Sequence, residues 1–171
     1  MEKYFYHEKE GIYLDYDFVA KEHSKFVTLV SLYPFALAVS SNKERALKVL
    51  PYLELSSGIS CTTNHDDDVF YQWDHPAMWG ESALIAYMVL KNVEADVEAK
   101  RIEEKYMTII EKEFKKTGKL WEKYSAIDGS VMNAEYAAPL FYGLNGCSLS
   151  NICERKRMKL DIFIPVLFYI I

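Results

Sequence analysis

The feature that most constrains the fold is a pairing of helices, in which an apolar helix with almost no polar face precedes an amphipathic one. Residues 24–40 are the first apolar segment, and we expect a helix that begins at Ser24 and is kinked by Pro34. Asn42 is a suitable N-cap for the next helix, residues 43–53, whose apolar side chains form one stripe. The first helix should therefore be enclosed and the second half exposed.

The second pair repeats this order. Residues 82–90 are apolar on every side, whereas residues 95–117 are amphipathic, with Gly118 as a suitable C-terminal stop. The inward stripe of this last helix is Ile102, Tyr106, Ile109 and Phe114. Such alternation is produced by a toroid of inner and outer helices, and equally by a layered helical bundle. The chain is thus expected to be all-α, although residues 11–18 (GIYLDYDF) favour a short strand or an extended loop.

Charge and terminal segments argue against several classes of function. The net charge is −5 and the first 150 residues contain no basic stripe, which disfavours a nucleic-acid partner. The N-terminus lacks the pattern of a signal peptide, and the apolar residues 162–171 are about half of what a membrane-spanning helix needs. The three cysteines have no metal-site spacing and are expected to be free thiols. We therefore expect a cytoplasmic chain without a membrane partner.

The loop before residue 82 is richer in chemical groups than a connector needs to be. Trp73 and Trp79 are either core anchors or a flat floor for a sugar ring, with Gln72, Asp74 and His75 as hydrogen-bonding neighbours. The preceding run His-Asp-Asp-Asp, residues 65–68, is a cation site or a solvated acidic turn. Without a spaced set of ligands the turn is the stronger interpretation, so we assign no metal and no cofactor.

The segment QWDHPAMW, residues 72–79, resembles the tryptophan-rich signature of the trehalase family, in which Gln-Trp-Asp-x-Pro is followed closely by Gly-Trp. Three further segments resemble the family in the same order, namely ELSSGIS upstream, and TGKLWEKYSAIDGS and NAEY downstream. PAMWGE replaces the Asn-Gly-Trp-Ala-Pro of better-known trehalases, which points to a divergent, bacterial branch. The resemblance implies an (α/α)6 toroid of the trehalase/glucoamylase-like type, of which this chain would be roughly the C-terminal half.

The resemblance also implies roles for single residues. Glu135, in NAEY, would be the general base, and Lys123 would keep it ionised, orient Glu122, or form no more than a surface ion pair. The residues expected to contact the sugar are Gln72, Trp73, Asp74, Trp79, Glu122, Lys123 and Tyr124. Asp15 and Asp17 correspond to a strand that follows the region of the family's general acid, so they are expected to be structural or to support residues that contact the sugar. No stretch of this sequence matches the motif of the acid itself.

Two functions remain open. The first is hydrolysis of an α-glucosidic bond, in trehalose or a related small glucoside, with inversion of configuration. In that case residues 1–146 would be a partial catalytic domain, which a separate N-terminal half or self-association would complete, and residues 147–171 a divergent tail. The alternative is an inactive remnant or a sugar-binding fragment without a general acid.

Overall fold

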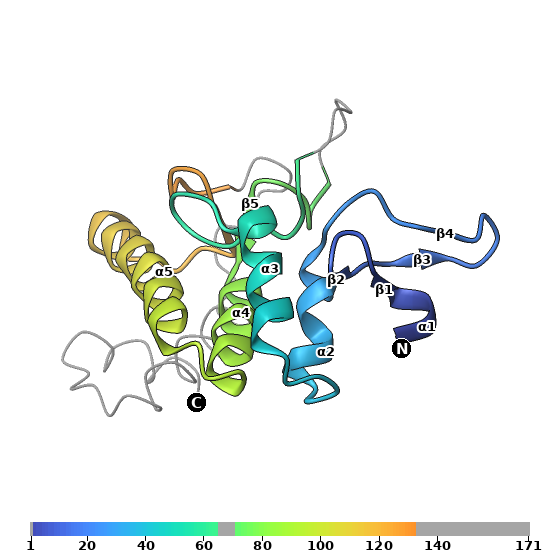
Figure 1. Cartoon of the computed structure of the whole chain (residues 1–171). Coiled ribbons are helices and arrows are strands. Elements are labelled where there is room, and N and C mark those ends of the chain that lie inside the picture. Colours follow the sequence, from blue (N-terminus) through green and yellow to red (C-terminus); the bar gives the residue numbers. More distant parts are fainter. Residues whose placement is uncertain (1, 65–70, 133–171) are drawn as a thin grey trace, which may run out of the picture.

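The computed structural model describes residues 2–64 and 71–132 (Figure 1). Three long helices stand side by side, α3 (Lys43–Leu53), α4 (Gly80–Asn92) and α5 (Asp96–Thr117). The middle helix, α4, contacts α5 on one side and α3 and the single turn α2 (Tyr33–Ala36) on the other. This position explains the composition of α4, because a helix with neighbours on both sides needs apolar residues around most of its circumference.

The predicted ends of α3 and α5 are confirmed. The Asn42 side chain accepts a hydrogen bond from the backbone N–H of Arg45, which caps α3. Gly118 adopts a φ of 68° at the end of α5, a left-handed conformation that glycine reaches without steric cost. The inward stripe of α5 is buried at Ile102, Tyr106 and Ile109.

The enclosed helix predicted for residues 24–40 is wrong. The segment contains only a 3-10 turn, η1 (Leu29–Leu32), and α2. Thr28, not Ser24, caps η1. Pro34 lies in the first turn of α2, where a backbone N–H would have no acceptor within the helix, so proline is tolerated there. Several apolar side chains of the segment are exposed, namely Phe26, Val30, Tyr33, Leu37 and Val39.

Two small hairpins precede this segment, and the second, within residues 16–23, extends away from the helices (Figure 1). After α1 (Glu2–Phe5), β1 (Tyr6–His7) pairs with β2 (Ile12–Tyr13), and β3 (Tyr16–Asp17) pairs with β4 (Glu22–His23), both antiparallel. The strand expected within residues 11–18 is therefore present. As predicted, Asp17 is structural: its Oδ1 accepts from the N–H groups of Ala20 and Val19, and these bonds lower its pKa.

A third antiparallel pair joins β5 (Ala77–Trp79), directly before α4, to β6 (Lys123–Ser125), a few residues after α5. In this register Met78 faces Tyr124, and both side chains are fully buried. The pair thereby fixes the tryptophan-rich loop against the end of the α4–α5 hairpin. Every strand in the described part of the chain is two or three residues long, so its long elements are helices, as predicted.

Candidate functional site

Trp79 is the buried half of the tryptophan-rich loop. It ends β5 opposite Lys123, and it is only 2% exposed. Its N–H donates to the Ser82 hydroxyl at 3.0 Å, and that hydroxyl donates to the Trp79 carbonyl at 2.7 Å, which caps α4. Cys61 and Ala77 share its buried cluster, and burial raises the pKa of the Cys61 thiol to about 12. The direct sugar contact predicted for Trp79 stays a prediction, although little of its ring is accessible.

Trp73 is the exposed half. Its ring stacks on that of Trp79 with 4.0 Å between centroids and 7° between planes. The indole Nε1–H of Trp79 also donates to the backbone carbonyl of Gln72 at 3.2 Å. Trp73 nevertheless remains 43% exposed, and the side chain of Gln72 is exposed beside it. Of the two alternatives for Trp73, the exposure argues against a core anchor and favours a surface that a ligand can reach.

Asp74 follows Trp73 in the chain but is 4% exposed. Its Oδ1 accepts from the Thr62 hydroxyl at 2.7 Å and from the N–H of His75, also at 2.7 Å. The same His75 N–H approaches Thr62 Oγ1 at 3.0 Å. Asp74 was expected to contact sugar hydroxyls, and this contact stays a prediction. In the structure its buried carboxylate ties the tryptophan-rich loop to Thr62.

A cleft of about 290 Å³ adjoins Trp73. Its lining residues are Ser24, Phe26, Thr28, Thr62, Tyr71, Trp73 and Asp74. Aromatic rings and short hydroxyl side chains on one surface suit a carbohydrate, whose rings carry apolar C–H faces between hydroxyl groups. The structure therefore brings Trp73 and Asp74, which the sequence predicted, together with hydroxyl and aromatic side chains that it did not.

Three of the missed residues, Ser24, Phe26 and Thr28, come from the segment that was wrongly expected to be an enclosed helix. Thr28 and Thr62 form an antiparallel bridge, and the N–H of Thr63 donates to the carbonyl of Val27 at 2.9 Å. This long-range pairing brings Phe26 to the cleft. No periodic pattern in residues 24–28 indicates such a pairing, so sequence reasoning had no signal for it.

Lys123 and Tyr124 do not line the cleft. Lys123 is 1% exposed, with its Nζ 5.8 Å from the centroid of the Trp79 ring, so it does not lie at the surface, where the predicted ion pair placed it. Tyr124 is fully buried, and its hydroxyl oxygen accepts from the N–H of Trp121 at 2.9 Å. Burial raises the pKa of Tyr124 to about 12. The sugar contacts predicted for both residues stay predictions, and Glu122 between them is partly exposed.

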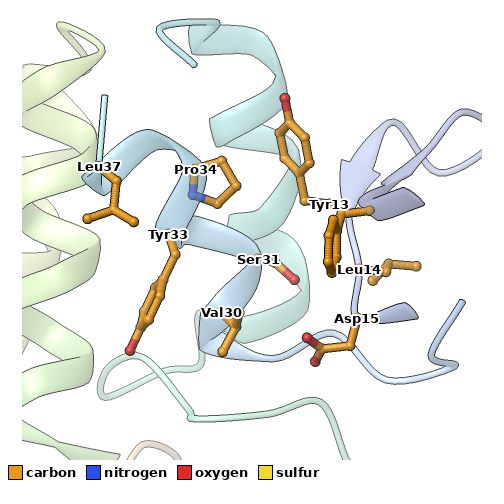
Figure 2. A pocket seen from close by; sticks show the side chains of 9 residues that line it. Tyr13, Leu14, Asp15, Val30, Ser31, Tyr33, Pro34 and Leu37 are labelled. Carbon is orange, nitrogen blue, oxygen red and sulfur yellow. The ribbon is translucent and has the colours of Figure 1, made fainter. Parts of the chain in front are cut away.

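Figure 2 shows a second cavity, of about 210 Å³, between the β2–β3 segment and the η1–α2 turn. Its lining residues are Phe5, Tyr13, Leu14, Asp15, Val30, Ser31, Tyr33, Pro34 and Leu37. The walls are almost entirely apolar, and Leu37 is 68% exposed. Asp15 accepts a long hydrogen bond, 3.5 Å, from the hydroxyl of Thr28. Such a surface suits a protein segment better than a sugar, because it offers few hydrogen-bonding groups.

Some predicted residues lie outside the described residues, namely Glu135, the acidic run 65–68 and the tail 147–171. Within residues 2–64 and 71–132, no group of three or more His, Cys, Asp or Glu side chains is arranged to hold a metal ion. Over the same ranges, no helix has both the length and the apolar character needed to cross a membrane.

Comparison with known proteins gives consistent matches. The sequence model of the family described as Trehalase matches residues 1–147. The cytosolic neutral trehalase of Beauveria bassiana (strain ARSEF 2860) is 30% identical over 149 residues, which are 80% of this chain and 20% of that protein. The periplasmic trehalase of Xanthomonas campestris pv. campestris (strain 8004) is 31% identical over 146 residues, 81% of this chain and 25% of that protein. The chain thus spans about a fifth to a quarter of the length of these curated relatives.

Solved structures show the same fold. Neutral trehalase Nth1 from Saccharomyces cerevisiae matches with a TM-score of 0.73 and 21% identity, over 93% of this chain and 28% of that one. The GH63 mannosylglycerate hydrolase from Thermus thermophilus in complex with glucose matches with a TM-score of 0.62 and 14% identity, over 88% of this chain and 36% of that one. At these identities the likeness concerns the fold alone.

Proposed function

Because this chain belongs to the trehalase family, we propose that it is part of a glycosidase domain that hydrolyses trehalose or a related α-glucoside with inversion of configuration. The curated relatives are several times longer than the matched region, so the activity is proposed for the whole protein of which this chain is a part. They include both cytosolic and periplasmic trehalases, and for this chain we propose the cytoplasm.

The observation that carries the proposal is the cleft beside Trp73. The stacked indole offers a flat apolar face, and the hydroxyls of Thr28 and Thr62 lie in the same cleft. A pyranose ring requires this combination, since its C–H groups pack on an aromatic face while its hydroxyl groups need hydrogen-bond partners. We propose that Trp73 is the floor of a subsite for one glucosyl unit.

For the chemical step we propose Glu135 as the general base. Inverting hydrolysis uses one carboxylate to activate water and one carboxylic acid to protonate the leaving oxygen, about 6.5–9.5 Å apart. The sequence contains no stretch that resembles the acid motif of the family, so we expect the acid to come from another segment. The first carboxylate to test as a replacement for Glu135 is Glu122, which is partly exposed.

We further propose that this other segment completes an (α/α)6 toroid and covers the apolar cavity of Figure 2. The exposed side chains of Val30, Tyr33 and Leu37 around that cavity support this proposal, because a closed toroid buries the apolar sides of its inner elements. The second candidate function is a chain that binds sugar without cutting it. The absence of an acid motif from the sequence favours this alternative.

The test separates binding from catalysis. Trehalose is titrated into the 171-residue chain and into its Trp73→Ala variant, with Trp121→Ala as a control outside the cleft. We expect Trp73→Ala alone to weaken binding, and the chain by itself to hydrolyse trehalose no faster than buffer. If Trp73→Ala leaves the affinity unchanged, the subsite is not at this cleft.

Catalysis is tested by joining the chain to an N-terminal trehalase segment that carries the acid. The joined protein is expected to turn over, and Glu135→Gln to remove most of its activity while preserving sugar binding. Near-wild-type rates in Glu135→Gln would assign the base to another carboxylate. A joined protein that binds trehalose without hydrolysing it would favour the second candidate function.

A further inference from the structure

Trp73 is held in place by Trp79. Trp79 contacts it in two ways, through the stacked ring face at 4.0 Å and through the hydrogen bond from its Nε1–H to the carbonyl of Gln72 at 3.2 Å. The first contact sets the plane of the Trp73 ring, and the second fixes the backbone from which that ring projects. Both contacts come from a side chain that is only 2% exposed.

Trp79 is itself fixed from several directions. Its backbone is paired across β5–β6 with Lys123 and is bonded twice to the Ser82 hydroxyl at the start of α4. Its ring packs in the buried cluster with Cys61 and Ala77, and the Nζ of Lys123 lies 5.8 Å from the ring centroid. An indole bounded in this way has no alternative rotamer to reach without disturbing the start of α4.

We propose that Trp79 is a positioning residue, which holds the exposed ring of Trp73 in one plane. The face of a pyranose ring can then bind in the cleft without a further loss of side-chain freedom at Trp73. The identity of the ligand rests on the proposed function, whereas the positioning of Trp73 does not. An exposed tryptophan with free rotamers would lose that freedom on binding, and this cost weakens affinity. A ring already stacked on Trp79 has lost the freedom during folding, so the cost is absent from the binding step.

The test observes Trp73 directly in the 171-residue chain. Three tryptophans give three indole N–H signals in an NMR spectrum of the protein labelled with 15N-tryptophan. Replacing each one in turn by phenylalanine assigns these signals. The motion of the Trp73 indole is then measured by the heteronuclear NOE in wild-type protein, in Trp79→Phe, which lacks the N–H but keeps a ring, and in Trp79→Leu, which lacks both contacts. Trp121→Phe is the matched control, because its indole bonds to Thr117 outside the cleft.

We expect the heteronuclear NOE of Trp73 to fall in Trp79→Leu and to fall less in Trp79→Phe, while the signal of Trp121 stays unchanged. In uniformly 15N-labelled protein, backbone amide signals far from position 79 should also stay unchanged. Trehalose affinity should weaken in the same order, by up to about tenfold in Trp79→Leu. A purely structural role would broaden or shift the whole spectrum instead of one indole signal. Should Trp79→Leu not fold, Trp79→Phe decides, because it retains a buried ring.

The possible results separate the two proposals. A Trp73 indole that stays as rigid in Trp79→Phe and Trp79→Leu as in wild type overturns the positioning role, whether or not trehalose binds. An indole that becomes mobile in these variants, in a chain whose wild type does not bind trehalose, supports the positioning role and contradicts the sugar subsite. The Trp73 indole could also become mobile in these variants without any loss of trehalose affinity. Trp79 would then position Trp73, but binding would not depend on that position, which overturns the functional part of the inference.

Discussion

Gly58 lies against a fully buried methionine, Met78. A Cβ built on Gly58 would lie 2.0 Å from the Sδ of Met78, and Met78 is 0% exposed. In Gly58→Ala the methionine must therefore move within a packed core. We expect the free energy of unfolding to fall by about 1–3 kcal/mol, as in other overpacked cores. Urea unfolding followed by circular dichroism measures this loss.

The clash itself is tested by shortening its partner. Met78→Ala alone should be destabilising because it leaves a cavity, but it also makes room for the new methyl group at position 58. The double variant Gly58→Ala/Met78→Ala should therefore lose less stability than the two single variants together. Strictly additive losses would show that an alanine at Gly58 does not press on Met78.

The chemistry of single residues could be predicted from the sequence better than their burial. Trp73 was recognised as either a sugar floor or a core anchor, and it is exposed beside a cleft. A surface ion pair was predicted for Lys123, and yet both Asp74 and Lys123 are buried, at 4% and 1% exposed, which is unusual for charged side chains. Lys123 is drawn inward by the strand pairing with Trp79, a contact between segments that are separated by two helices. No local pattern encodes such a contact.

At the scale of elements, Glu54 links the end of α3 to α5. Its carboxylate accepts from Arg101 Nε and Nη2, each at 2.8 Å, and from Lys105 Nζ at 2.7 Å, and its side chain is 12% exposed. Burial opposes ionisation of this group, but the hydrogen bonds from Arg101 and Lys105 outweigh it. The pKa of Glu54 is consequently lowered from its ordinary value of 4.5.

This lowered pKa predicts how stability depends on pH. A carboxyl group that binds its proton less tightly in the folded state stabilises the fold above its unfolded pKa, and that contribution is lost as the pH falls through the folded-state pKa. We expect Glu54→Gln to lose about 1–3 kcal/mol at neutral pH, because the pair of cations loses a charged acceptor. The difference from wild type should shrink as the pH is lowered below 4.5. Urea unfolding over this pH range measures it.

Glu104 on α5 provides the control. It pairs with Lys100 one turn away, at 3.5 Å, and both side chains are mostly exposed. Such pairs contribute little because water screens them, so Glu104→Gln should leave stability nearly unchanged at every pH. Equal losses in Glu54→Gln and Glu104→Gln would contradict a special role for the Glu54 link between α3 and α5.

Helices with clear end signals were predictable, whereas the segment without them was not. α3 has Asn42 before it and α5 has Gly118 after it, and both ends are where the sequence indicated. Residues 24–40 are apolar enough for an enclosed helix, but apolar character alone does not distinguish a helix core from a surface that another segment covers. The cap at Thr28 and the position of Pro34 limit this segment to two short turns.

At the scale of the whole molecule, we expect the isolated chain to self-associate through the cavity of Figure 2 and its exposed rim. Exposed apolar surface of this kind lowers its free energy by finding a partner surface. Leu37→Glu should shift the chain toward monomer, because a charge at this 68% exposed position would be buried in the contact. Sedimentation velocity over a range of protein concentrations measures the effect.

Val97→Glu is the matched control, since Val97 is 75% exposed on α5 and does not line the cavity. It adds the same charge and should leave the association state as in wild type. A wild-type chain that stays monomeric at all concentrations and melts in one sharp transition would contradict the prediction. It would also show that the chain closes its own core, against the proposal that another segment of the family fold covers this cavity.

The pairing of β5 with β6 has a consequence for the kinetics of folding. α4 begins directly after Trp79, and α5 ends shortly before Lys123, so packing α4 against α5 already brings the two strands together and shortens the loop that their pairing must close. Residues 77–125 are therefore expected to open and close as one cooperative unit, whose amide protons exchange with a common opening free energy. Since Trp73 rests on Trp79 at the edge of this unit, the ring stays in place for as long as the helical hairpin stays closed. The time for which the Trp73 ring stays in position would then be set by the rate at which α4 and α5 separate, although neither helix lines the cleft.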